Sequence, residues 1–118
     1  MLPSKAEEYK TGLDESCPIG PVPVANSSLA DPHSLKIKAI HNGEVVQNSN
    51  TREMFFNIQQ IIAFLSQGTT LEKGTIIMTG TGPGIGIMRK PPIILRDGDD
   101  MRIEISEIGT LVNYVHYE

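Results

Sequence analysis

The chain has 118 residues, enough for one domain with a core of its own. Its formal net charge of −4, with 10 basic and 14 acidic residues, gives no electrostatic basis for binding nucleic acid. No apolar run approaches the ~20 residues of a membrane helix, and the first residues do not resemble a targeting signal. Cys17, the only cysteine, cannot form an internal disulfide. We therefore expect a cytoplasmic protein that binds neither nucleic acid nor membranes.

The first elements predicted along the chain are two strands joined by a tight turn. Residues 12–34 are rich in proline and small polar residues, which favours an irregular segment. Apolar residues then alternate with lysines over residues 35–39, a pattern typical of a half-buried strand. Asn42-Gly43 is the strongest short hairpin signal, so residues 44–48 are expected to return antiparallel.

One helix is predicted to interrupt the strands. Its apolar residues recur at helical spacing, namely Ile58, Ile61, Ile62 and Leu65. Asn57 and Gln60 have the spacing of a capping box, and Gly68 is placed as a C-terminal cap. These signals predict a helix that begins after Asn57 and ends before Gly68.

The second half of the chain is again predicted to be mainly strand. We expect strands over residues 75–79, 101–105 and 110–116, with an acidic turn at 97–100 before the last two. The predicted fold is mainly β with one helix. The helix would pack on an antiparallel-rich sheet that forms a sandwich or an open barrel.

The segment 79–86, Thr-Gly-Thr-Gly-Pro-Gly-Ile-Gly, is the most informative motif. Its glycines bring backbone amides and two threonine hydroxyls close to any neighbour, which suits an anionic or carbonyl ligand. The glycine spacing matches neither a dinucleotide fingerprint nor a P-loop. From these residues alone, a ligand-binding loop and a purely structural loop are both open.

The remaining candidate residues favour structural interpretations. Cys17 has no neighbouring base that would make it a nucleophile. His33, His41 and His116 lack the spacing of metal ligands. The acidic turn at 97–100 lacks the alternating oxygen ligands and the later Glu of a calcium loop.

An ordered series of short motifs resembles the C-terminal part of the fumarylacetoacetate hydrolase family. The motifs are Gly12-Leu13-Asp14, Ser16-Cys17-Pro18-Ile19-Gly20-Pro21, Asp31-Pro32-His33, Asn42-Gly43-Glu44, Gln47-Asn48, Asn50-Thr51, Phe64-Leu65-Ser66, Thr70-Leu71, Thr79-Gly80-Thr81, Gly84-Ile85-Gly86 and Ile108-Gly109-Thr110-Leu111. The resemblance implies an incomplete mixed β-roll or sandwich of that family's type over residues 12–118, which is the C-terminal part of a catalytic domain. Residues 1–11 would be a divergent N-terminal segment.

The resemblance also implies a chemistry. Members of this family bind Mg²⁺ or Mn²⁺ and cleave or rearrange carbon–carbon bonds of small oxo acids and diketones, as acylpyruvate hydrolases, oxaloacetate decarboxylases or isomerases. A chelated cation would stabilise the enolate that forms when the bond breaks. Thr81 occupies the position that binds the substrate carboxylate, and Gly80 would bring the backbone close to it.

Three departures from the family pattern shape what we expect of this chain. The family's cation ligands lie upstream of the segment that Gly12 begins, so no metal ligand is assigned here. The catalytic lysine would be Lys10, one residue out of register, and Gly82 stands where the family has proline. We therefore expect a chain that is truncated and inactive alone and that self-associates or forms a homo-oligomer. The alternative is a non-catalytic β-domain that serves as a binding or subunit-contact module.

Overall fold

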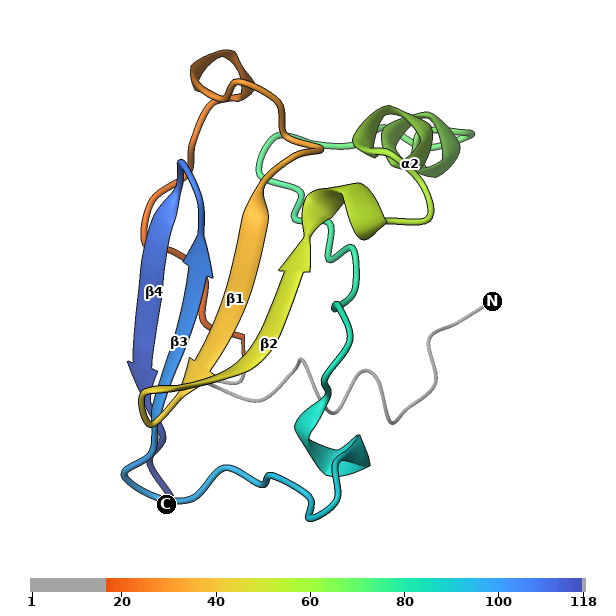
Figure 1. Ribbon diagram of the computed structural model, residues 1–118. Coiled ribbons are helices and arrows are strands. Elements are labelled where there is room, and N and C mark those ends of the chain that lie inside the picture. The colour runs from red at the N-terminus through yellow and green to blue at the C-terminus, as the bar shows by residue number, and fades with distance from the viewer. Residues whose placement is uncertain (1–16, 118) are drawn as a thin grey trace.

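The computed structural model describes residues 17–117, and its centre is one open sheet. Four antiparallel strands lie in the order β2-β1-β3-β4 (Figure 1). Their bounds are Lys36–His41 for β1, Glu44–Asn50 for β2, Asp100–Ile105 for β3 and Gly109–Tyr114 for β4. Two hairpins are thus joined through the β1–β3 pair. The prediction of a mainly β, antiparallel fold with one helix is confirmed.

Both predicted hairpins form where the turn residues placed them. Asn42 and Gly43 have φ values of 48° and 84°, so both central residues of the first turn are left-handed, as a tight hairpin turn requires. The second hairpin turns between Ile105 and Gly109. Strand β4 ends at Tyr114, two residues earlier than predicted, because the next residue pairs with the turn before β3 rather than with β3 itself.

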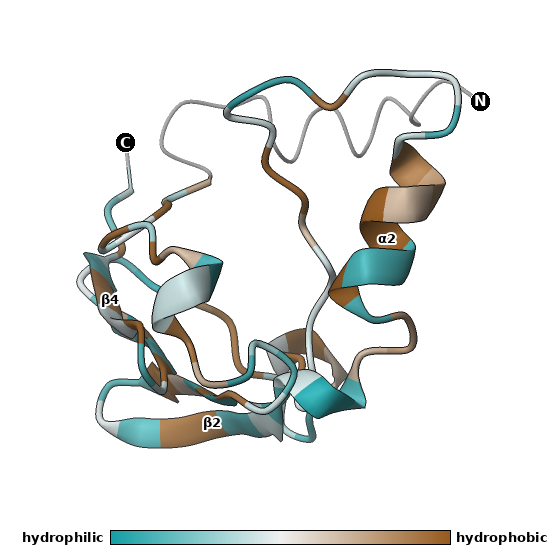
Figure 2. Ribbon diagram, turned by 90° about the horizontal axis from the view of Figure 1, so that it is seen from above, coloured by the Kyte–Doolittle hydropathy of each residue, from teal (hydrophilic) through white to brown (hydrophobic). Residues whose placement is uncertain are grey.

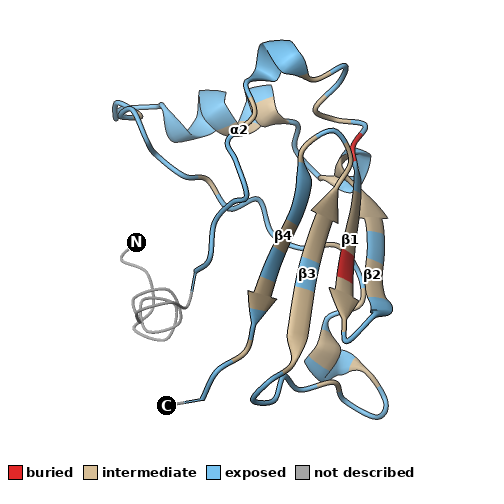
Figure 3. Cartoon of the chain, turned by 90° about the vertical axis from the view of Figure 1, so that its left-hand side faces the viewer, coloured by how far each residue is buried: buried red, intermediate tan, exposed pale blue. Residues whose placement is uncertain are grey.

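The two faces of the sheet differ in polarity. Ala39 lies opposite Gln47 on one side and Ile103 on the other, and Ile103 lies opposite Leu111, so these residues share one largely apolar face. Ala39, only 3% exposed, is one of two buried residues among those that the structure describes (Figure 3). The opposite face carries ion pairs such as Lys38 with Glu104 at 3.7 Å. The site described below lies on the apolar face.

The single α-helix, α2 (Ile58–Leu65), has the predicted capping box. The Asn57 side chain accepts from the Gln60 backbone N–H at 2.8 Å, and the Gln60 side chain accepts from the Asn57 N–H at 2.9 Å. Ser66 rather than Gly68 caps the C-terminus. Residues 17–117 contain no helix with the length and apolar character needed to cross a bilayer.

The expectation that the helix packs on the sheet is wrong. Helix α2 lies beyond the end of β2 and to the side of the sheet (Figure 1 and Figure 2). The reason is the 3₁₀ turn η2 (Thr51–Glu53), which directly follows β2 and leads the chain away from the sheet. The apolar side chains of Ile62, Phe64 and Leu65 are consequently exposed.

The predicted strand at 75–79 is also wrong. Within residues 17–117 this segment pairs with no strand and has no regular secondary structure. Ile76 and Met78 on it are exposed. An apolar run of this kind becomes a strand only when a neighbouring strand supplies its hydrogen bonds, and no strand within residues 17–117 pairs with it.

Candidate functional site

The glycine segment 79–86 runs alongside β2 on the apolar face of the sheet, and its glycines divide into two groups. A Cβ at Gly82, Gly84 or Gly86 would lie 2.5–2.8 Å from atoms of Ser49, Val46 or Ile93, respectively, so these three positions are glycine because the loop packs tightly. Nothing lies within 4 Å of a Cβ built at Gly80. The first part of the loop therefore faces open space, and the later part is anchored.

A β-bulge in β2 provides the anchor. Ala39 lies opposite Gln47 whereas Ile40 lies opposite Val45, so Val46 is an extra residue in the ladder. Such a residue is left out of regular pairing and re-aims its neighbours. The Val46 carbonyl accepts a hydrogen bond from the Arg89 guanidinium, and Arg89 Nε also donates to the Gly84 carbonyl at 3.3 Å. The bulge and Arg89 thus hold the loop against β2.

Gln47, next to the bulge, contacts the front of the loop. Its side-chain amide nitrogen lies 3.0 Å from Thr81 Oγ1, 2.9 Å from the Gly82 carbonyl oxygen and 3.2 Å from the Pro83 carbonyl oxygen. The two hydrogens of this nitrogen are shared among three successive loop residues, which ties this part of the loop to β2.

Two adjoining grooves meet at residues Gly80–Gly82. The larger has a volume of about 270 Å³ and the smaller about 110 Å³. The larger groove is lined by apolar side chains together with hydroxyl, amide and carboxyl groups: Ile37, Ser49, Asn50, Thr51, Glu53, Met54, Phe55, Phe56, Ile61, Thr79 and Thr81. Mixed apolar walls with a few polar groups are typical of small-molecule sites.

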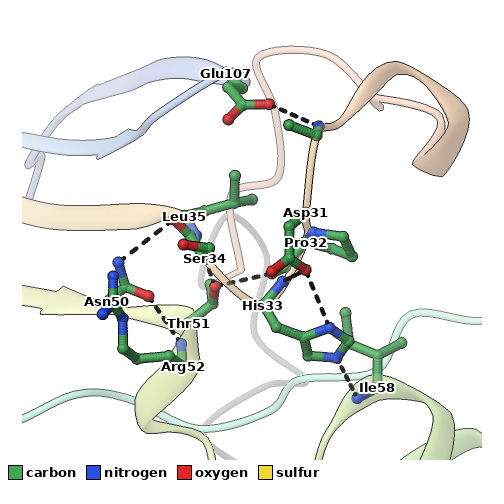
Figure 4. A network of polar contacts seen from close by, with 11 residues as sticks. Asp31, Pro32, His33, Ser34, Leu35, Asn50, Thr51, Arg52, Ile58 and Glu107 are labelled. Atoms are coloured by element: carbon green, nitrogen blue, oxygen red, sulfur yellow. Dashed lines mark hydrogen bonds and ion pairs between the residues drawn. The ribbon is translucent and has the colours of Figure 1, made fainter.

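A polar network joins the segment before β1 to η2 and to the start of α2 (Figure 4), and its member Thr51 also lines the larger groove. Thr51 Oγ1 donates to the Pro32 carbonyl at 2.8 Å and accepts from the Leu35 N–H at 3.0 Å. His33 Nε2 accepts from the Ile58 N–H, at the first turn of α2, at 3.1 Å. Because that nitrogen accepts, the ring proton of a neutral His33 is on Nδ1, 3.5 Å from the Asp31 carboxylate.

Charged residues lie at two places beside the sheet, one at the larger groove and one at the end where the β1–β2 hairpin turns. Glu53 is at the larger groove, where its carboxylate accepts from Ser49 Oγ at 2.5 Å. At the end of the sheet where the β1–β2 hairpin turns, hydrogen bonds from the Asn42 amide and then from His41 and the Arg96 N–H hold the pKa of Asp99 at about 2. That second cluster joins the β1–β2 turn to the turn before β3.

The structure places the predicted site residues as follows. Gly80 and Thr81 lie together at the junction of the two grooves. Lys10 lies outside the described residues. Cys17 and His116 are exposed, whereas His33 and His41 are half-buried. Residues 17–117 hold no cluster of three His, Cys, Asp or Glu side chains that could bind a metal ion, so the described residues do not fit a divalent cation.

Three residues of the site were not singled out by the sequence reasoning for a role there: Gln47, Ser49 and Arg89. Gln47 was noted only as part of a motif, and its contact with the loop depends on the bulge at Val46, which leaves no local signature. The proximity of Ser49 had one indirect signal. Gly82 replaces the proline of the family pattern, and the structure shows that Ser49 occupies the space a larger residue there would need.

Comparison with known proteins gives consistent matches. A family model described as fumarylacetoacetate (FAA) hydrolase C-terminal matches residues 3–116. A mitochondrial oxaloacetate tautomerase of Homo sapiens is 50% identical over 103 residues, 87% of this chain and 33% of that protein. The chain thus spans about a third of the length of the curated relatives it matches.

Two solved structures are similar in fold and sequence. A fumarylacetoacetate hydrolase from Exiguobacterium antarcticum has a TM-score of 0.85 and 40% identity, and the match covers 90% of this chain and 38% of that one. A maleylpyruvate hydrolase from a Sphingobium species, solved with manganese(II) and pyruvate, has a TM-score of 0.75 and 36% identity. That match covers 86% of this chain and 36% of the other.

Proposed function

Since the chain belongs to the fumarylacetoacetate hydrolase C-terminal family, we propose that its glycine loop binds the carboxylate of a small oxo acid or diketone. The chain would supply the carboxylate-binding wall of a site that cleaves a carbon–carbon bond or interconverts keto and enol forms. Thr81 would donate its hydroxyl hydrogen to the carboxylate, and Gly80 would let the ligand approach the backbone.

The observation that carries this proposal is the division of the loop into an anchored part and an open part. Gly82, Gly84 and Gly86 are packed against neighbours, whereas Gly80 has open space beside it. Thr81 lies between the two parts, exposed at the groove junction. An exposed hydroxyl group and an unobstructed backbone at the junction of two grooves support a ligand-binding loop over a purely structural one.

The similar proteins support the ligand class. One relative is named an oxaloacetate tautomerase, and one similar structure is a maleylpyruvate hydrolase that holds pyruvate. Oxaloacetate, maleylpyruvate and pyruvate share a carboxylate next to a carbonyl or enol carbon. We therefore propose a 2-oxo acid as the ligand of the loop.

The metal does not enter the proposed role of the described residues. A divalent cation, when bound in such a site, would stabilise an enolate, and one similar structure contains manganese. Residues 17–117 contain no cluster of three ligating side chains that would hold it. We therefore assign to these residues carboxylate binding alone, and expect the isolated chain to bind the acid without turning it over.

A second candidate function is supported by exposed apolar surface. Phe55 is fully exposed, and Phe64 and Met88 are exposed by more than two thirds. Apolar exposure of this extent marks contact surfaces. We propose that these residues contact another polypeptide, either a second copy or a further part of a longer chain. This second function is compatible with the first.

The test of carboxylate binding is isothermal titration of the full chain with pyruvate. Thr81→Val keeps the shape of the side chain and removes the donor, so affinity should fall about tenfold, the worth of one charge-assisted hydrogen bond. Thr110→Val, in β4, is the matched control and should bind like the wild type. Equal affinities for all three proteins would refute the role of Thr81. Stoichiometric binding of Mg²⁺ or Mn²⁺, or turnover of oxaloacetate, would refute the assignment of carboxylate binding alone.

A further inference from the structure

The side-chain amide of Gln47 faces two backbone carbonyl groups. The carbonyl oxygens of Gly82 and Pro83 lie 2.9 and 3.2 Å away and cannot donate. The atom that faces them must therefore be the amide nitrogen, because the amide oxygen would be repelled. The two hydrogens of this nitrogen are then shared among three acceptors, the third being Thr81 Oγ1, 3.0 Å away.

This donation determines what the Thr81 hydroxyl can do. A hydroxyl group has one hydrogen to donate and two lone pairs that accept. With one lone pair bound to Gln47, the hydrogen of Thr81 is free to point away from β2. Its one protein acceptor among the described contacts is the Gly82 carbonyl at 3.4 Å, a long and weak bond. The hydroxyl group is therefore available to donate toward the groove.

We propose that Gln47 is a positioning residue that keeps the Thr81 hydroxyl hydrogen directed at a ligand carboxylate. The identity of the ligand rests on the proposed function, whereas the orientation of the hydroxyl group does not. A glutamine suits this role because it is neutral and donates. A carboxylate at the same position would accept the Thr81 hydrogen itself and would repel an anion in the groove.

Gln47→Glu distinguishes positioning from simple packing, because it changes the shape of the side chain very little. When deprotonated, the new carboxylate would accept the hydrogen of Thr81. When protonated, it would donate one hydrogen bond, as the amide does. The field of the new carboxylate acts whether or not Gln47 positions Thr81, so the comparison is repeated in a Thr81→Val background, where only an effect that runs through the hydroxyl group is lost. Gln47→Met, which has similar length and no donor, serves as the control that does not titrate.

The first test needs no ligand. In the full chain with ¹³C-labelled threonine methyl groups, the Thr81 methyl resonance of Gln47→Glu should follow a single carboxyl titration that the wild type and Gln47→Met lack. The Thr110 methyl resonance is the internal reference. A flat Thr81 resonance in a natively folded Gln47→Glu protein would overturn the proposal. If that variant does not fold, Thr81→Val should shift the Gln47 side-chain NH₂ resonances, and unchanged resonances would overturn it.

The second test measures pyruvate affinity against pH. At pH 7 we expect Gln47→Glu to bind at least about tenfold more weakly than the wild type, with recovery as the pH is lowered and the new carboxyl group is protonated. A constant deficit at all pH values would refute the positioning role. If the wild type itself does not bind pyruvate, the proposed function fails, and the methyl titration still decides the orientation of the hydroxyl group.

Discussion

The contact between Gly82 and Ser49 gives the sharpest test of how the loop is held. A Cβ at Gly82 would lie 2.6 Å from Ser49 Oγ and 2.8 Å from Ser49 Cβ. The φ of Gly82 is outside the left-handed region, so alanine could adopt this backbone without strain. The effect of Gly82→Ala should therefore be purely steric, and it should depend on residue 49.

The size of the effect follows from the two distances. Carbon atoms pack at about 3.5–4.0 Å, so the loop and β2 would have to separate by roughly 1 Å. Overpacking of this kind typically costs about 1–3 kcal/mol of unfolding free energy. Ser49→Gly removes both obstructing atoms, so Gly82→Ala should cost little in that background. The coupling energy should reach about 1–2 kcal/mol. Ser49→Ala, which leaves the 2.8 Å contact, should relieve only part of the cost.

The assay is urea unfolding of the two single variants and the double variant, with the m-value checked for each. Gly84→Ala is the matched control. Its Cβ would meet the Val46 backbone carbonyl at 2.8 Å and its φ is +105°, so Ser49→Gly should give no relief there. Additive free-energy changes for Gly82→Ala and Ser49→Gly would refute the packing of the loop described above.

Three further predictions concern stability and assembly. The pKa of Asp99 is lowered from 3.8 to about 2, so the stability that its carboxylate contributes is present above the pKa of the unfolded chain and is lost between about pH 4 and pH 2. Asp99→Asn should therefore flatten the dependence of the urea-derived unfolding free energy on pH over that range. An unchanged pH profile would contradict this. His33→Ala removes the acceptor of the Ile58 N–H and should lower the unfolding free energy by about 0.5–1.5 kcal/mol. Urea unfolding measures this change, and an unchanged unfolding free energy would show that the hydrogen bond is dispensable. Exposed apolar residues such as Phe55 should cause concentration-dependent association in analytical ultracentrifugation, whereas a sharp monomer that melts above about 65 °C would argue against it.

The parts of the fold that were predictable from the sequence are those set by local rules. The turn at Asn42-Gly43 needs left-handed backbone at both residues, and Asn-Gly is one of the few dipeptides that adopt it readily. The capping box of α2 likewise involves residues three apart in the chain. The failures were non-local. Whether residues 75–79 pair, and where α2 packs, depends on surfaces that lie far away in the sequence.

The candidate site was predictable to the same extent. The glycine content of the loop indicated close approach, and the family resemblance singled out Gly80 and Thr81. The contacts of Gln47 could not be foreseen, because a one-residue bulge at Val46 sets them and nothing in the local sequence marks it. The family resemblance showed only that Gly82 stands where the family has proline, whereas the structure gives a steric reason in Ser49.

The most direct measurement of the central claim is a map of backbone amide shifts of the ¹⁵N-labelled chain during titration with pyruvate. Carboxylate binding at the glycine loop predicts saturable shifts that are largest at residues 80–82 and in the Gln47 side-chain amide, and that are weakened by Thr81→Val. Saturable shifts centred elsewhere, or none at any pyruvate concentration, would contradict it.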